Sequence, residues 1–391
     1  MSASGYSDTR MNTDTKPLRI VHCFRSPVGG IFRHVRDLVN AQHAAGHLVG
    51  VVCDSSTGGE FEDRLFASME PKLALGLTRI PMKRHIGTGD ITAAWRAYKA
   101  IQKLNPDVLH GHGAKGGAYA RAFGSVLRVF RSRVARFYSL HGGSLHYSDN
   151  ILSGKVFFLI ERLLGTMTDE LLFVADFERK TYQEKIGRPG AATVVYNGLR
   201  PEEFVAVSPN ADAADFLYIG MMRDLKGPDL FIDALRLASS HAGRPLTAVM
   251  VGAGDDLPKY KRQVEQRGLS SRVRFFDPLP ARDAFKLARC IVVPSRAEAM
   301  PYIVLEALGA GMTLVATAVG GIPEILGDDS VALCVPSVES IAEKMAMFAT
   351  EPNKISNAMP DKAELQAKFG ADVMARQIEA RYRAALAGAR A

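Results

Sequence analysis

The sequence predicts an α/β protein of two doubly wound, parallel-sheet domains that face each other across a cleft. Short apolar runs of strand length alternate with stretches of helical periodicity along the 391 residues, which is typical of parallel strands joined by crossover helices. The alternation pauses once, near the middle of the chain, and then restarts. A chain of this length, of which 47% is hydrophobic, can bury two such cores.

The elements expected in each half follow the same rhythm. In the first half we expect helices at 31–46 and 91–105, and strands at 18–24, 47–54, 107–113, 136–142, 170–175 and 193–198. In the second half we expect helices at 227–241, 259–268 and 281–289, and strands at 215–221, 246–254, 272–277 and 290–295. Ligands of such domains bind at the carboxyl ends of the strands.

The pause in the alternation marks the domain boundary. The segment LRPEEFVAVSPNADAAD, 199–215, is rich in Pro, Ala and acids and has no period, so we expect the interdomain linker there. The first domain would cover 17–200 and the second 201–365, followed by a helical stretch at 366–391. Asn197-Gly198, just before the linker, favours a turn and is expected to act as a hinge.

The charge is unevenly distributed. Residues 1–200 hold 27 Lys and Arg against 17 Asp and Glu, whereas residues 201–391 hold 22 against 24. A basic first half suggests an anionic partner. No aromatic-interleaved basic patch or zinc-finger spacing occurs, so we expect no nucleic acid. An anionic membrane surface fits better, contacted through Arg128, Arg131 and Arg133 in a segment whose apolar residues would equally suit an ordinary core.

Cysteine spacing and hydropathy predict a cytoplasmic protein. If it contacts lipid, we expect it to bind peripherally at the inner face of the membrane. Residues 1–16 lack an apolar core and are expected to form a disordered tail, not a signal peptide. The most apolar stretch, VFFLIERLLG, is interrupted by Glu161 and Arg162 and is too short to span a bilayer. No disulfide framework or metal spacing links the scattered cysteines, which we expect to be buried thiols: Cys23, Cys53, Cys290 and Cys334.

Residues 290–326 hold the most informative pattern. The run CIVVPS ends in a polar turn containing Glu298, and Pro301 stands where the first helical residue is expected. Seven residues separate Glu298 from Glu306. Two carboxylates beside a helix start suit a ligand with central phosphates and hydroxyl-rich ends, such as a nucleotide sugar, although two exposed acids on an ordinary loop are the alternative. The amides that would face the phosphates belong to Tyr302, Ile303 and Val304.

This spacing matches the E-x(7)-E motif, and the chain resembles glycosyltransferase family 4, whose members are retaining enzymes of two Rossmann-like domains (the GT-B fold). The resemblance covers nearly the whole chain after the N-terminal tail. It implies that Glu306 holds the ribose hydroxyls, and that Glu298 and the amides after it hold the sugar. Met300 and Pro301 stand where family members more often have smaller residues, and they could change which donor sugar fits the site. In the family the final helix usually crosses back to the first domain, as we expect for 366–391.

The loop GMMRDLKGPDLFIDA follows the first strand of the second half. Arg223 and Lys226 lie beside a helix start there, and two cations suit a diphosphate, although a solvated basic loop has the same composition. The R-x-x-K-G spacing resembles the diphosphate-binding pair of the family. Gly252, in VGAGDD, resembles the family's glycine turn at the cleft and lacks the third glycine of a dinucleotide site.

Three segments of the first half follow predicted strands. Gly29 and Gly30 permit a tight turn whose amides could face a phosphate. His141, in SLHGG, resembles the family histidine that reaches the donor sugar, although a histidine at a strand end is more often structural. We interpret HGHGAKGG as acceptor-side, through His110, His112 and Lys115.

These histidines could be mistaken for a metal site, but no acid or thiol completes one and the chain has no D-x-D pair. We therefore expect no metal and no cofactor. The resemblance implies transfer of a hexose from a UDP- or GDP-hexose to a hydroxyl of a glycan or polyprenyl-linked acceptor, in bacterial polysaccharide or lipid-linked glycan assembly. The departing phosphate would take the acceptor proton. The alternative is a nucleotide-sugar-binding GT-B protein of another activity, an epimerase or a non-catalytic sensor.

Overall fold

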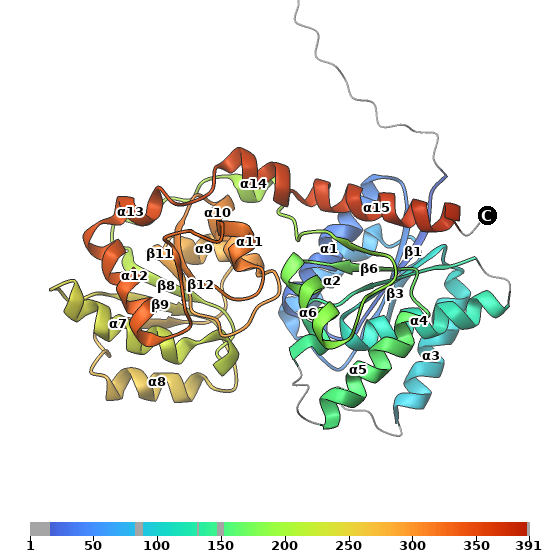
Figure 1. Ribbon diagram of the computed structural model, residues 1–391, viewed down its shortest axis with the longest axis horizontal. Helices are drawn as coiled ribbons and strands as arrows, with labels where there is room; N and C mark the ends of the chain where they lie inside the picture. The colour runs from blue at the N-terminus through green and yellow to red at the C-terminus, as the bar shows by residue number, and fades with distance from the viewer. Residues whose placement is uncertain (1–15, 83–88, 131–132, 147–151, 389–391) are drawn as a thin grey trace, which may run out of the picture.

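The computed structural model describes residues 16–82, 89–130, 133–146 and 152–388. These residues form two parallel sheets, of seven and six strands, each covered by helices (Figure 1). The predicted fold class is therefore confirmed. The expected disordered tail lies, except for residue 16, outside the described residues.

The first sheet has the strand order β3-β2-β1-β4-β5-β6-β7. Its strands are β1 (Arg19–Phe24), β2 (Leu48–Asp54), β3 (Gly76–Ile80), β4 (Val108–His112), β5 (Ala135–Ser139), β6 (Glu170–Phe173) and β7 (Ala192–Val194). Its helices are α1 (Gly29–Ala44), α2 (Glu60–Met69), α3 (Gly89–Leu104), α4 (Gly113–Val129), α5 (Leu152–Gly165) and α6 (Asp176–Lys185), with short turns η1 (Glu70–Lys72) and η2 (Gly143–His146). The order reverses between β1 and β4, so the loops after these strands diverge and open a crevice.

The second sheet has the order β10-β9-β8-β11-β12-β13. Its strands are β8 (Ala214–Ile219), β9 (Ala248–Val251), β10 (Val273–Phe276), β11 (Ala288–Val293), β12 (Thr313–Thr317) and β13 (Leu333–Cys334). Its helices are α7 (Pro228–His241), α8 (Leu257–Gln266), α9 (Ala281–Phe285), α10 (Tyr302–Gly309), α11 (Ile322–Leu326), α12 (Val338–Thr350), α13 (Pro352–Ser356) and α14 (Lys362–Phe369), with turns η3 (Pro201–Phe204) and η4 (Asp224–Lys226). Here the order reverses between β8 and β11.

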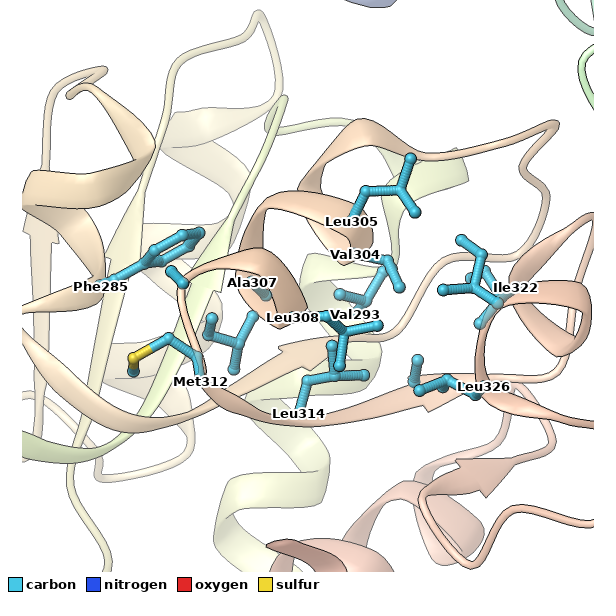
Figure 2. Close-up of a cluster of buried hydrophobic side chains, with 14 of the residues drawn as sticks. Phe285, Val293, Val304, Leu305, Ala307, Leu308, Met312, Leu314, Ile322 and Leu326 are labelled. Atoms are coloured by element: carbon cyan, nitrogen blue, oxygen red, sulfur yellow. The ribbon is translucent and has the colours of Figure 1, made fainter. Parts of the chain in front are cut away.

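Helix α10 is anchored in the core of the second domain. Val304, Leu305 and Leu308 are buried and pack with residues of β11, β12 and α11 (Figure 2). A buried side chain of this kind stabilises the fold by about 1.5–3 kcal/mol relative to an exposed one. The start of α10, where the sequence predicts a phosphate site, is therefore held rigidly at the carboxyl end of the sheet.

The chain crosses between the domains twice, and the two crossings pair. Leu199 donates its amide to the carbonyl of Phe369 at 2.7 Å and accepts from the amide of Ala371 at 2.8 Å. Beyond this point α15 (Ala371–Gly388) runs back over the first domain (Figure 1). Its buried residues, among them Tyr382, pack against β1, β4 and β5, so the last helix belongs to the core of the first domain.

Most element boundaries shift by a few residues from the sequence expectations, and two of the shifts lie beside the predicted site. The helix expected at 281–289 ends at Phe285, because Ala288 already pairs with Ala214 as the first residue of β11. Pro301 is the residue before α10 and not its first residue: its ψ of 120° is extended. No helix among the described residues is both long and apolar enough to cross a bilayer.

Candidate active site

Glu298 and Lys226 meet at the cleft side of the second sheet. Lys226 Nζ donates to both carboxylate oxygens of Glu298, at 2.6 and 2.8 Å, and Ser295 Oγ donates to one of them at 2.7 Å. The loop that carries Glu298 packs closely on Gly320, where a Cβ would lie 2.1 Å from the Glu298 carbonyl oxygen. The structure thus brings together, in one ion pair, residues of the E-x(7)-E and R-x-x-K-G motifs that lie 72 residues apart in the sequence.

Three other predicted residues lie on the cleft side of the second domain; one is exposed, and two are glycines that allow close packing. Arg223 is exposed at the start of η4, and no side-chain hydrogen bond or ion pair occupies it within the described residues. Gly227 and Gly252 allow loops to touch: a Cβ would lie 2.1 Å from the Pro294 carbonyl oxygen at the first and 1.9 Å from that of Gly220 at the second. Gly252 therefore acts through loop packing at the sheet edge.

The start of α10 faces the glycine turn of the first domain. A Cβ on Gly30 would lie 3.7 Å from the Tyr302 ring, whereas one on Gly29, which has a φ of +65°, would meet nothing within 4 Å. The Val304 amide donates to the Pro301 carbonyl at 3.2 Å. Of the three amides expected at this point, those of Tyr302 and Ile303 are therefore left for a ligand.

Arg33 crosses from α1 to the second domain, and the sequence interpretation missed it. Its guanidinium forms an ion pair with Glu306, donates to both oxygens of Glu203 at 2.7 Å, and lies 4.4 Å from the centroid of the Tyr302 ring. Glu306, expected to hold the ribose, therefore already has a cationic partner. The available signal was the position of Arg33 near the start of a helix that opens with two glycines.

Met300 lies in the core beneath the donor loop, with only 4% of its surface exposed. Its carbonyl accepts from the Asn197 amide at 2.8 Å, and the Asn197 oxygen lies 3.0 Å from Nδ1 of His34 in α1. Asn197, expected as a hinge residue, thus links the donor loop to the first domain. Any effect of Met300 on the sugar would pass through the loop backbone.

Five histidines gather at the carboxyl ends of β1, β4 and β5 and on the facing side of α1. A chain of hydrogen bonds runs from Gln42 to His22 at 2.8 Å, from His22 to His112 at 3.0 Å, and from His112 to His141 at 3.1 Å. His110 lies beside this chain, bonded to Tyr382 of α15 at 2.6 Å and to Ser139 at 2.9 Å. The cluster therefore joins the core of the domain to the cleft.

The chain of hydrogen bonds has one consistent direction. The Gln42 carbonyl oxygen can only accept, so His22 Nε2 carries a proton and His22 Nδ1 accepts from His112 Nε2. By the same reasoning His112 Nδ1 accepts from Nε2 of His141. The amide nitrogen of Gln42 is left to donate to Tyr382. His141 therefore keeps a lone pair on Nδ1.

The residues that the sequence singled out in the first domain differ in how far they are exposed. His141 is partly exposed, and Lys115 lies partly exposed in the first turn of α4. His112 is buried and adjoins His141, whereas His110 is fully buried with both ring nitrogens bonded. His110 therefore supports the site from within the core and has no nitrogen free for an acceptor.

Burial keeps the histidines neutral. It lowers the pKa of His22 and of His34 to about 4. Burial, followed by repulsion from neighbouring imidazoles, lowers the pKa of the other three well below the usual value: His110, His112 and His141. At neutral pH these rings offer hydrogen bonds without net charge, and a neutral imidazole is no proton donor to a departing phosphate.

Glu178 fixes the turn that carries His141. His141 has a φ of +53°, which is costly for a residue with a Cβ. The Glu178 carboxyl accepts from the next amide, Gly142, at 2.5 Å and from the Val174 amide at 2.9 Å. Burial raises the pKa of Glu178 to about 7. The sequence interpretation missed Glu178, which shows no motif and is recognisable only from this contact.

A cavity of about 920 Å³ lies between the two domains beside these groups. Glu298 and Gly320 line it from the second domain, and Gly142, Glu178 and Lys180 from the first. Glu324 closes one side by accepting from the amides of Asp176 and Phe177 at the start of α6. The space is large enough for a sugar nucleotide, since ligand pockets commonly measure 300–1,000 Å³.

Comparison with known proteins agrees with this geometry. Residues 28–203 match the family model described as Glycosyltransferase Family 4, and residues 200–366 match the model described as Glycosyl transferases group 1. A D-inositol 3-phosphate glycosyltransferase of Kribbella flavida is 30% identical over 252 residues, which are 57% of this chain and 59% of that relative. A glycogen synthase of Mycobacterium tuberculosis is 28% identical over 353 residues, 83% of each protein.

Among solved structures, the Anabaena protein Alr3699/HepE in complex with UDP and glucose is similar with a TM-score of 0.74 at 17% identity, covering 93% of this chain and 99% of that one. This likeness concerns the fold. The two family models together extend from residue 28 to residue 366, with the E-x(7)-E pair in one and the glycine turn in the other, and the chain belongs to the family 4 glycosyltransferases with the GT-B fold.

Proposed function

We propose that this protein transfers a hexose from a nucleotide diphosphate sugar to an acceptor hydroxyl, with retention at the anomeric carbon and without a metal ion. The acceptor is a glycan or a polyprenyl-linked sugar, and the setting is bacterial polysaccharide or lipid-linked glycan assembly. The observation that supports this most is the Lys226–Glu298 ion pair, because Glu298 lines an interdomain cavity whose other side includes Gly142, the residue after His141.

The cations of the second domain suit the departing diphosphate. Lys226 is held by Glu298, whose carboxylate also accepts from Ser295, and Arg223 is exposed on the same loop. Charges that are already in place cost no reorganisation when negative charge develops on the leaving phosphate. Glu298 Oε2, which does not accept from Ser295, and the backbone after Glu298 would hold the hydroxyls of the hexose. These cations replace the metal that other phosphate sites use, which supports metal independence.

The first domain would supply neutral hydrogen bonds to the sugar. Nδ1 of His141 carries a lone pair, so it can accept from a hydroxyl of the hexose. Because the His141 pKa is well below 7, the ring is no general acid. The acceptor proton would therefore pass to the leaving phosphate oxygen, with no covalent enzyme intermediate. Lys115 would stand on the acceptor side, whereas His112, with both ring nitrogens bonded, would support His141 from beneath.

Glu306 would hold the ribose hydroxyls, which would compete with Arg33 for its carboxylate. The two are paired in the described structure, and Arg33 keeps a second carboxylate partner in Glu203. A nucleotide can therefore bind the Glu306 carboxylate in place of Arg33, because Glu203 still neutralises the charge of Arg33. Similar Anabaena structures are described as complexes with UDP and UDP-glucose, which makes UDP-hexoses the first donors to test, followed by GDP-hexoses.

The test is nucleotide release from a panel of UDP- and GDP-hexoses with EDTA present. We expect slow hydrolysis of one donor, loss of it in Glu298→Gln, and an unchanged rate in Glu339→Gln, which alters an acid of α12 far along the chain. Conversion of the donor to another hexose would instead indicate an epimerase. Donor binding without any turnover, even with lipid-linked and glycan acceptors added, would indicate a sensor and contradict the proposal.

A further inference from the structure

Helix α5 exposes an apolar stripe to solvent. Leu152 is 78% exposed, and the other exposed apolar residues follow at helical spacing along about 17 Å of one face: Val156, Leu159, Ile160 and Leu163. The opposite face of α5 buries Phe158 and Glu161 against the domain. A core helix would have hidden these leucines, so the stripe needs a partner.

The helices beside α5 also expose apolar side chains. Helices α3, α4 and α5 lie beside one another over the first sheet (Figure 1). Eleven of the eighteen large hydrophobic residues exposed in the described part of the chain lie on these helices or within two residues of their ends. Trp95 of α3 and Phe130, just after α4, are 62% and 69% exposed. Scattered surface apolar residues are ordinary, but this concentration is not.

The same helices present cations and hide their described acid. Glu161 is buried and paired with Arg121 at 2.8 Å. The exposed charged residues described on the three helices are all basic: Arg96, Lys99, Lys103, Lys155 and Arg162. A second copy of this chain would bring cations against cations. An anionic bilayer complements both the apolar stripe and the charge.

We propose that the face made by α3, α4 and α5 docks on an anionic lipid bilayer, with the α5 stripe inserted among the headgroups. The arginines expected from the sequence contribute less. Arg128 is paired with Asp169 at 2.5 Å and Arg133 donates to the carbonyl of Leu386 at 3.3 Å, while Arg131 lies outside the described residues.

The docking face adjoins the active site. The three helices start at the carboxyl edge of the first sheet, where β4 and β5 lead to His112 and His141. Leu152, at the start of α5, follows His141 by only eleven residues. If the proposed transfer to a lipid-linked acceptor holds, which this step assumes, the acceptor hydroxyl can enter the cleft directly from the membrane surface. The docking itself does not depend on that function.

The test is co-sedimentation of the full chain with phosphatidylcholine vesicles, with or without about one third phosphatidylglycerol. We expect binding to the anionic vesicles that weakens at high salt. Leu159→Glu/Leu163→Glu should reduce the partition coefficient at least about tenfold. The matched control is Phe61→Glu/Val335→Glu, two residues 57% and 60% exposed elsewhere on the molecule, which should bind like wild type. Lys99→Gln/Lys155→Gln should weaken binding to anionic vesicles only.

Three outcomes would overturn the proposal: no binding of the wild type to anionic vesicles, equal binding of the α5 variant, or equal loss in the control variant. Concentration-dependent dimerisation that Leu159→Glu/Leu163→Glu abolishes, without vesicle binding, would identify the face as a contact between copies. Nucleotide release without vesicles should be the same in all variants. Its absence in wild type, even with lipid-linked and glycan acceptors added, would contradict the proposed function and leave the docking result standing.

Discussion

The two walls of the cleft are built from different chemistry. The second domain presents fixed charges, with Lys226 against Glu298 and Arg296 against Asp229. The first domain presents neutral imidazoles, with His141 at the end of a hydrogen-bond chain that starts at Gln42 in the core. A wall of charges suits a diphosphate, and a neutral wall can bond hydroxyls without competing for the phosphate. In the proposed function, the second domain would therefore hold the leaving group and the first domain would orient the sugar.

The walls also differ in how they are assembled. The second domain places its charged groups on two loops, after β8 and after β11, each a compact motif in the sequence. The histidine cluster draws on β1, α1, β4, β5 and α15, so its members are up to 272 residues from their partners. Arg33 is the one charged group of α1 found in the second wall.

The largest expected effect comes from removing charge from the second wall. Lys226→Met should lower the rate of nucleotide release about 10²–10³-fold, the usual loss when one fixed donor to a developing charge is removed. It also leaves the partly buried Glu298 carboxylate without its cation, so the thermal midpoint should fall. Lys226→Met/Glu298→Gln should recover the midpoint and not the rate.

Lys259→Met is the control for this change. Lys259 is an exposed cation of the same domain, paired with Asp224 at 3.2 Å, and its loss should leave release unchanged. A rate in Lys226→Met within twofold of wild type would show that Lys226 is a structural partner of Glu298 and no part of the chemistry.

The neutral wall should lose stability in acid. Burial holds the pKa of His22 and His34 at about 4, below the value of 6.5 in the unfolded chain. As the pH falls from 6.5 to 4, the unfolded state takes up protons first, so the free energy of unfolding decreases, by roughly 3 kcal/mol for His22 alone. Urea midpoints measured between pH 7.5 and about 4.5 test this.

Two carboxyls oppose this trend. Burial raises the pKa of Glu178 to about 7 and that of Asp37 to about 6, so each stabilises the fold more as the pH falls through its folded pKa. Five histidines should outweigh them. Glu178→Gln removes one opposing group and should steepen the acid loss, whereas a midpoint that rises on acidification would show that the cluster is protonated when folded.

The direction of the hydrogen-bond chain gives a smaller effect. Gln42→Met removes the acceptor for His22 and should lower turnover about tenfold while destabilising the fold by about 1–3 kcal/mol, the cost of an unsatisfied buried group. In Gln42→Glu a protonated carboxyl can accept from His22 and donate to Tyr382 as the amide does. This variant should recover turnover below the pKa of its new carboxyl and lose it above.

Nitrogen-15 spectra of histidine-labelled protein supply a readout that a merely structural role would leave unmoved. In wild type His22, His112 and His141 should all carry their proton on Nε2. Gln42→Met should mix the tautomers of these rings, and an unchanged set of tautomers would show that Gln42 does not determine the protonated nitrogen of His141.

The contrast between the walls also explains what the sequence could predict. Alternating elements predicted both sheets, and the loop motifs singled out Glu298 and Lys226, which the fold pairs, because these signals are local. Gln42 and Glu178 had no local signal, and Arg33 had only its position near the start of α1: each acquires its role from a partner on another element. Periodicity also placed the apolar residues of α5 in a helix, but it could not tell which face the sheet would leave uncovered.

The smallest expected effect is that of metal removal. Two overlapping histidine triads, one of His22, His110 and His112 and one of His34, His112 and His141, have ring nitrogens within 4.8 Å of one another, so the cluster is where an ion would bind. Yet His22, His110 and His112 each use both nitrogens in hydrogen bonds, and a metal would have to break several of these. We therefore expect EDTA to change neither nucleotide release nor the thermal midpoint, and metal analysis to find less than one equivalent. One bound equivalent of zinc, with a midpoint that falls in EDTA and recovers on adding zinc, would make the neutral wall a metal centre and remove the contrast on which the other predictions depend.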